Sequence, residues 1–265
     1  MDPGTRPDPH AAGCDNGAHE RHSDRRRKRP PGPAAGAPVM GPADGRGAGE
    51  GGGAGDRPDD ALSRISAATL AYYDGNADAF WRGTRDHDVS QNIAALLSHI
   101  EGSPPFTLLD LGCGPGRDLK ALAGLGHRPV GLDGAARFVA MAAAYSGCPV
   151  WHQDFVRLDL PDGRFDGIFA NAALFHVPAA ALPRVLAELH AALKPGGVLF
   201  ASNPHGQDEE GWRGGRFGRF HHPVTWQGYG TRAGFVELVR YYRPAGLPRE
   251  QQPWLATVWR KVGEP

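Results

Sequence analysis

The sequence predicts an α/β fold in which a doubly wound parallel sheet is covered by helices on both faces. The first observation is that, over residues 108–202, short apolar runs alternate with stretches whose apolar residues recur at helical spacing. The second is that the first apolar run, 108–111, ends in glycines at every second position: Gly112, Gly114 and Gly116. A buried strand that enters a tight turn and opens a helix at Arg117 produces this pattern.

The glycine turn indicates a nucleotide-binding corner, because glycine tolerates unusual backbone angles and lets a ligand approach the main chain. Asp110 lies inside the strand just before the glycines, which are spaced Gly-x-Gly-x-Gly and not Gly-x-Gly-x-x-Gly as in dinucleotide sites. A carboxylate at this point repels a phosphate and attracts an ammonium group. We interpret Cys113, inside the turn, as a small filler and not as a nucleophile.

Residues 110–116 resemble the first motif of the class I S-adenosylmethionine-dependent methyltransferases, in particular their type 11/25-like domains. The resemblance continues to residue 202, through a fourth-strand motif and a Lys-Pro-Gly-Gly turn at 194–197. It implies a single Rossmann-like domain whose seven-stranded sheet includes an antiparallel last strand. It also implies that S-adenosylmethionine is the cofactor, that Asp110 holds its amino-acid end, and that the turn, with Cys113, wraps it.

The composition is that of a soluble protein rich in Gly and Pro, with 265 residues and a formal net charge of zero. A neutral chain has no global field that draws it to nucleic acid or an anionic membrane, and no apolar run approaches a membrane span. The cysteines Cys14, Cys113 and Cys148 show neither metal-ligand spacing nor disulfide density. We therefore expect a cytoplasmic protein with no metal, nucleic-acid or membrane partner; its oligomeric state is not predicted.

Residues 1–60 are expected to form a disordered arm rich in Gly, Pro and Arg, preceding a domain at 61–265. The arm contains no Leu, Ile, Phe, Tyr or Trp, so it cannot bury enough apolar surface to offset the entropy of ordering. A basic run at 25–29 is either a solvated part of this arm or a contact for nucleic acid or a partner.

Helical spacing predicts two helices before the first strand, at 61–73 and 86–100, which form an N-terminal helical lid over 61–101. The segment between them contains Gly and Asn and is dense in aromatic residues. These either pack on the sheet edge or close over the ligands. In the resembling enzymes a tyrosine pair here commonly forms such a lid, which makes Tyr73 a candidate cofactor contact and Trp81 a candidate acceptor contact.

Acidic residues follow the second and third predicted strands, 129–132 and 150–152. Asp133, beside Gly134, can accept hydrogen bonds from a ribose diol, or it can cap the helix that begins near 135. Asp154 can accept from an adenine amino group while Phe155 covers the ring, a role that the resemblance also gives to this acid. With Asp110, three carboxylates at successive strand ends indicate one ligand laid across the sheet.

The fourth strand, 165–170, ends at Asn171 and Ala172, which the resemblance places beside the methionine portion and the transferable methyl group. His176 follows this strand, and we leave three roles open for it: general base, cavity lining, or structural hydrogen bond. A helix at 182–193 and a turn at 194–197 then lead into the fifth strand.

Two loops, 203–223 and 243–253, are predicted on the substrate side. Trp212 and Arg216 in the first would suit an acceptor that has a carboxylate and an aromatic part; the alternative is a surface hairpin anchored by its aromatic residues. The next helix is poorly specified because residues 226–232 contain two glycines. Alternation predicts closing strands at 235–242 and 254–261.

The resemblance favours methyl transfer to an oxygen, nitrogen or sulfur atom of a small molecule, by in-line displacement at the sulfonium carbon. One alternative is an NAD(P)-dependent oxidoreductase on the same sheet, disfavoured by Asp110 and by the glycine spacing. Another is a protein that binds the cofactor without turnover.

Overall fold

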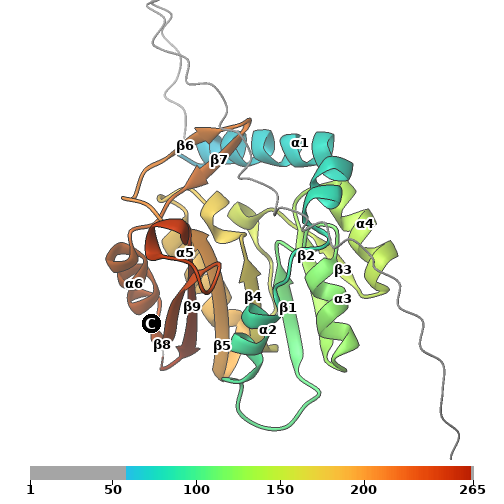
Figure 1. Cartoon of the computed structure of the whole chain (residues 1–265), viewed down its shortest axis with the longest axis vertical. Helices are drawn as coiled ribbons and strands as arrows, with labels where there is room; N and C mark the ends of the chain where they lie inside the picture. Colours follow the sequence, from blue (N-terminus) through green and yellow to red (C-terminus); the bar gives the residue numbers. More distant parts are fainter. Residues whose placement is uncertain (1–57, 264–265) are drawn as a thin grey trace, which may run out of the picture. The chain divides into compact units, whose positions relative to one another are not determined.

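The computed structural model describes residues 58–263, which form a seven-stranded sheet in the order β3-β2-β1-β4-β5-β9-β8 (Figure 1). The strands are β1 (Thr107–Leu111), β2 (Arg128–Asp133), β3 (Val150–His152), β4 (Phe165–Asn171), β5 (Leu193–Pro204), β8 (Phe235–Arg243) and β9 (Trp254–Lys261). Strands β1 to β5 pair in parallel, whereas β9 is antiparallel to both of its neighbours. This arrangement confirms the predicted fold class. The arm expected at 1–60, with its basic run, lies outside the described residues except for its last three positions.

Helices cover both faces of the sheet, because apolar side chains leave each strand on alternate sides. The helices are α1 (Pro58–Thr84), α2 (Ser90–Leu97), α3 (Arg117–Gly124), α4 (Ala136–Ser146), α5 (Leu182–Ala192) and α6 (Pro223–Arg232), with short 3₁₀ turns η1 (Phe155–Arg157), η2 (Leu174–His176) and η3 (Arg249–Gln251). Residues of α2 and α3 pack with Leu108 and Phe200 on one face. Residues of α5 and α6 pack with Leu109 and Leu199 on the other.

Two helices precede the first strand, as predicted, but α1 continues without a break for 27 residues, so the predicted end of the first helix at residue 73 is wrong. An interior glycine destabilises a helix by about 1 kcal/mol relative to alanine. Packing outweighs this penalty: Ala77 is fully buried and lies in one apolar cluster with Tyr73, Phe80 and Phe138 of α4. The consequence is one continuous rod along the carboxyl edge of the sheet, next to strands β6 (Glu210–Arg213) and β7 (Arg216–Arg219) (Figure 1).

The predicted loop at 203–223 is largely a hairpin, β6 (Glu210–Arg213) and β7 (Arg216–Arg219). Strand β7 is fixed to the lid, because the backbone N–H of Phe217 donates to Thr69 Oγ1 of α1 at 3.1 Å. The poorly specified helix forms as α6, and one of its glycines has a packing reason. A Cβ at Gly230 would lie 2.7 Å from the ring of Trp259, so glycine permits the close approach of α6 to β9.

The glycine turn joins β1 to α3 and also sets the distance between two helices. Gly116 precedes α3 with φ at +94°, in the left-handed region that favours glycine. A Cβ there would lie 2.8 Å from the Cα of Ala142 on α4. Gly116 therefore allows both the turn and the contact between α3 and α4.

Replacing Gly116 by alanine should lower the free energy of unfolding by about 1–3 kcal/mol, because the left-handed backbone becomes strained and Ala142 obstructs the added methyl group. The matched control is Gly124→Ala at the end of α3, where an added Cβ meets nothing within 4 Å. The control should match or slightly exceed wild type. Urea denaturation measures both variants, and equal stability of Gly116→Ala and wild type would contradict the assignment.

Candidate active site

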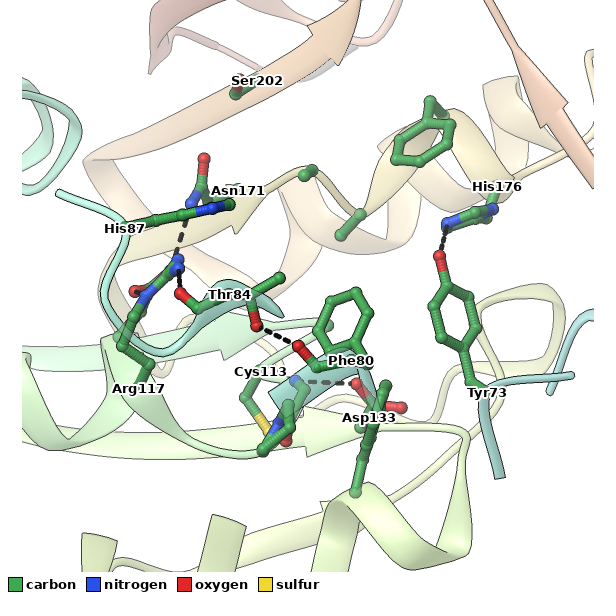
Figure 2. A pocket seen from close by; sticks show the side chains of 18 of the residues that line it. Tyr73, Phe80, Thr84, His87, Cys113, Arg117, Asp133, Asn171, His176 and Ser202 are labelled. Carbon is green, nitrogen blue, oxygen red and sulfur yellow. Dashed lines mark hydrogen bonds and ion pairs between the residues drawn. The ribbon is translucent and has the colours of Figure 1, made fainter. Parts of the chain in front are cut away.

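A cavity of about 790 Å³ lies at the carboxyl ends of the parallel strands, between the sheet and α1. Its wall includes the glycine turn, the residues after β2, β3 and β4, the 86–89 segment before α2, and Arg216 of β7. Ligand pockets in proteins typically have volumes of about 300–1,000 Å³. The cavity is thus large enough for a ligand of cofactor size, and Figure 2 shows the side chains that surround it.

Most of the predicted site residues line this cavity. The predicted cofactor residues among them are Tyr73, Gly112, Cys113, Gly114, Asp133, Gly134, Asp154, Phe155, Asn171 and Ala172. The predicted acceptor-side residues among them are Trp81, His176 and Arg216. Three predicted residues lie outside the lining: Asp110, Gly116 and Trp212. Lining is a matter of position only, so the roles assigned to these side chains stay predictions.

Asp110 is 2% exposed and is not among the residues that line the cavity. Within the described part of the chain its Oδ2 atom has no hydrogen-bond partner. Burial, followed by the neighbouring carboxyl of Asp118, raises the pKa of Asp110 well above its ordinary value. Strand alternation directs Asp110, like Leu108, towards the face covered by α3. Its expected contact with the amino-acid end of the cofactor stays a prediction.

Asp133 holds the glycine turn in place through a hydrogen bond to its backbone. Its Oδ2 accepts from the backbone N–H of Gly114 and its Oδ1 from that of Ala135, both at 2.9 Å. Burial raises the pKa of Asp133 to about 6, although these backbone donors act in the opposite direction. The bond to Ala135 lies before the first turn of α4, and Ala135, the N-cap residue, shows no side-chain cap, so the alternative role of Asp133 as a helix cap is not observed. The two oxygens retain further lone pairs, so the same carboxylate can also accept hydrogen bonds from a diol.

Asp154 connects the lid to the end of β3. Its Oδ1 accepts from Ser66 Oγ of α1 at 2.6 Å and from the backbone N–H of Val156 at 3.0 Å. Phe155 follows it and lies against the turn, because a Cβ at Gly112 would come 3.1 Å from the Phe155 ring. An acid and an aromatic ring therefore border one end of the cavity, as the sequence analysis expected.

A chain of polar side chains that the sequence analysis missed crosses the cavity floor. Tyr241 Oη donates to Asn92 Oδ1 at 2.9 Å, Asn92 Nδ2 donates to Asn171 Oδ1 at 3.0 Å, and Asn171 Nδ2 donates to Asp118 Oδ2 at 3.1 Å. Arg117 then binds both oxygens of Asp118, at 2.6 and 3.0 Å. One signal was available, because Asn92 shares an apolar helical stripe with Ile93 and Leu96. A polar residue on such a stripe needs a buried partner.

Arg117 and the loop after β8 also help to enclose the cavity. Arg117 Nη1 donates to the carbonyl oxygen of Thr84 at the end of α1, at 2.7 Å. Arg243 Nη2 donates to the carbonyl oxygen of Asp88 at 2.9 Å, and Trp254 packs edge-on against Phe175. No spacing pattern in the sequence predicts that these distant segments come together.

His176 is held between the lid and the hairpin (Figure 2). Its Nδ1 lies 2.6 Å from the carbonyl oxygen of Phe217, and its Nε2 lies 2.7 Å from Tyr73 Oη. Burial lowers the pKa of His176 to about 4 and raises that of Tyr73 to about 12, so the imidazole and the phenol are both neutral near pH 7. Two of the three roles considered for His176, cavity lining and structural hydrogen bond, are therefore present together.

The hairpin contributes Arg216 to the cavity but directs Trp212 elsewhere. The Arg216 guanidinium lies 5.5 Å from the centre of the Tyr72 ring and 5.8 Å from that of Tyr73. Trp212 is 53% exposed and packs edge-on against Phe217. Trp212 therefore corresponds to the alternative reading, an aromatic residue that anchors the hairpin. Trp81 packs against Tyr145 while it lines the cavity.

No helix within residues 58–263 is long and apolar enough to cross a bilayer. The His, Cys, Asp and Glu side chains of the same residues form no group of three or more that could hold a metal ion.

Comparison with known proteins identifies the domain. Residues 109–201 match the model of a family described as a methyltransferase domain. The trans-aconitate 2-methyltransferase of Azoarcus sp. (strain BH72) is 35% identical over 120 residues, which cover 44% of this chain and 47% of that protein. The sterol 24-C-methyltransferase of Yarrowia lipolytica is 34% identical over 136 residues, which cover 48% and 33%. The chain thus spans about half, or less, of the length of these curated relatives.

A solved structure extends the likeness of fold beyond the matched segment. It is that of the Burkholderia thailandensis 1,6-didemethyltoxoflavin-N1-methyltransferase with bound 1,6-didemethyltoxoflavin and S-adenosylhomocysteine. The TM-score is 0.65 at 22% identity, with coverage of 78% of this chain and 93% of that chain. The names of these relatives differ in the methylated atom, 24-C in one and N1 in another. The family match and the strand order together show that the chain carries a class I S-adenosylmethionine-dependent methyltransferase domain.

Proposed function

We propose that this protein transfers a methyl group from S-adenosylmethionine to an oxygen, nitrogen or sulfur atom of a small molecule. The observation that carries the proposal is the glycine cradle on the cavity wall. A Cβ at Gly114 would come within 4 Å of Phe80 alone, so it would occupy cavity space that a ligand against the turn needs. The family match over residues 109–201 supports the same activity.

The cofactor would lie along the carboxyl ends of β1 to β4. The acid and ring at Asp154 and Phe155 suit an adenine, and the free lone pairs of Asp133 suit the ribose diol. The methionine portion would follow the glycine turn towards Asn171 and Ala172, which border the cavity at the end of β4. Asp110 would act indirectly, through the turn and the start of α3, since it lies outside the cavity lining.

When bound, the cofactor supplies a methyl group on a sulfonium centre, which is reactive without further activation. The protein then has to hold the acceptor atom in line with the carbon–sulfur bond and keep water out. Helix α1 covers the site with Tyr73 and Phe80, and its end is fixed by the hydrogen bond from Arg117 to Thr84. A cavity whose wall is held in this way would orient the reactants in advance and so provide the entropic part of the rate enhancement.

The acceptor is proposed to be an anionic molecule with a planar part. Arg216 lines the cavity, and no Asp or Glu among the described residues forms an ion pair with it. A guanidinium so placed can bind a carboxylate through two hydrogen bonds. Phe175 and Trp254 supply ring faces in the same cavity. The relative named for trans-aconitate, a carboxylate, is consistent with this class.

The alternatives lead to different ligands or products. A nicotinamide-dependent oxidoreductase would bind NADH and would not bind S-adenosylhomocysteine. A protein without turnover would bind the cofactor and label no acceptor. We also propose a cytoplasmic location, consistent with Cys113 and Cys148, which are free thiols.

The affinity for S-adenosylhomocysteine should rise from pH 5 to 7 and level off above that range. Asp133 accepts hydrogen bonds best as a carboxylate, and its pKa is raised to about 6, so a higher pH provides more of the binding form. Asp133→Asn should remove this rise and weaken binding about tenfold or more, whereas the exposed control Asp162→Asn should keep the wild-type profile. Titration calorimetry from pH 5 to 8 measures the affinity of the wild type and of both variants for S-adenosylhomocysteine. A flat wild-type profile, or uptake of NADH without S-adenosylhomocysteine, would contradict the proposal.

Methyl-labelled S-adenosylmethionine, incubated with the protein and a metabolite extract, should label a carboxylate-bearing small molecule. With that acceptor, Arg216→Gln should raise KM about 10- to 100-fold and change kcat less, because a charged hydrogen-bonding partner is lost. Arg213→Gln is the matched control, since Arg213 is on the same hairpin but packs over Phe220 outside the cavity. An uncharged product, or equal KM values for the two variants, would refute the acceptor class. Absence of any label would favour a protein without turnover.

A further inference from the structure

The proton positions between His176 and Tyr73 follow from the geometry of two short contacts. A carbonyl oxygen is only an acceptor, so the contact of 2.6 Å between His176 Nδ1 and the Phe217 carbonyl requires the proton on Nδ1. In a neutral imidazole, Nε2 then carries a lone pair. The contact of 2.7 Å to Tyr73 Oη must therefore be a hydrogen bond that the tyrosine hydroxyl donates.

This arrangement fixes what the Tyr73 hydroxyl can offer to a ligand. Its only proton is committed to His176, and among the described residues it has no other hydrogen-bond partner. The ring cannot easily turn away, since it packs against Phe80 and Phe138 at centroid distances of 5.6 and 5.5 Å. Tyr73 Oη can therefore only accept a further hydrogen bond, through a free lone pair. It lies next to the cavity, which both Tyr73 and His176 line.

We propose that Tyr73 Oη accepts a hydrogen bond from the methyl-accepting atom itself, so that the site selects acceptors with an N–H or O–H group at that atom. Because the Tyr73 hydroxyl can only accept a hydrogen bond from the ligand, it binds the proton of the acceptor's N–H or O–H group. The nitrogen or oxygen lone pair is then left to face the methyl carbon. An alkene carbon offers no hydrogen to this hydroxyl and is not held by it. The inference rests on the proposed methyl transfer and narrows its acceptor atom.

The same two contacts provide a path for the proton that the reaction releases. As the new bond forms between the acceptor atom and the methyl carbon, the carbon–sulfur bond breaks and its electron pair stays on sulfur. The acceptor proton moves to Tyr73 Oη, and the tyrosine proton moves to His176 Nε2. The imidazolium of His176 forms only transiently, because burial opposes its charge while only the Phe217 carbonyl favours it, and its proton then leaves to solvent. The Tyr73 hydroxyl now carries the proton that came from the acceptor, and it can donate a hydrogen bond to the methylated atom.

The decisive measurement is the tautomer of His176 in the full chain saturated with S-adenosylhomocysteine. Long-range nitrogen–proton NMR correlation on protein with labelled histidine separates protonated from unprotonated ring nitrogens, and His176→Gln identifies the resonances. We expect a proton on Nδ1 only, and we expect the Nε2 resonance to move in Tyr73→Phe. A proton on Nε2, alone or with Nδ1, would overturn the inference, because Tyr73 would then present a donor to the cavity.

Turnover provides the second measurement, with the acceptor that the labelled extract identifies. The methyl group should be found on nitrogen or oxygen, and Tyr73→Phe should lower kcat/KM about tenfold or more. Tyr145→Phe, an exposed tyrosine outside the cavity lining, is the control and should match wild type. If His176 acts as a positioning and proton-holding residue, His176→Gln should lower kcat about 100-fold with little change in KM, because glutamine can accept the tyrosine proton's hydrogen bond but cannot take the proton.

The two measurements separate the possible failures. A methyl group on carbon or sulfur, or wild-type kcat/KM in Tyr73→Phe, would overturn the selection of acceptor while the proposed methyl transfer stands. Absence of transfer to any extract component would overturn the proposed function and the selection that rests on it. The NMR result does not depend on turnover, so it tests the hydroxyl's orientation in either case.

Discussion

The hydrogen bonds from the backbone N–H groups of Gly114 and Ala135 to Asp133 are the interaction on which the site depends. The Asp133 carboxylate joins the turn after β1 to the start of α4, so the carboxyl ends of β1 and β2 are held in a fixed position relative to each other. The position of these two strand ends sets the shape of the adjoining cavity floor. Because the carboxylate is buried, removing it would leave two backbone donors without partners, which is unfavourable in a protein interior.

The lid is attached to this floor by contacts spread along its length. Ser66 bonds to Asp154, Thr69 to the hairpin strand β7, Tyr73 to His176, and Thr84 to Arg117. Each is a single hydrogen bond, worth about 1 kcal/mol net. Apolar packing adds to these contacts, because Ala77, Tyr73 and Phe80 of α1 lie in one cluster with Phe138 of α4. The lid is therefore held both by hydrogen bonds and by buried apolar surface.

The succession of strands and helices and the position of the cavity at the strand ends could be predicted from the sequence, because apolar runs, the glycine turn and acids at strand ends are short-range signals. The antiparallel last strand was implied by the family resemblance and not by these local patterns. For Asp110, the motif gives the position of the residue but not the direction of its side chain. The floor chain from Tyr241 to Arg117 was missed for another reason: its members are far apart in the sequence, and only the folded chain brings them together.

A crystal structure of the protein with S-adenosylhomocysteine would show directly how the cofactor lies in the cavity. We expect ribose hydroxyls within hydrogen-bond distance of Asp133, the adenine beside Asp154 and Phe155, and the thioether sulfur facing the side of the cavity where Tyr73 meets His176. A ligand bound elsewhere, or one whose ribose lies away from Asp133, would contradict the proposed binding mode.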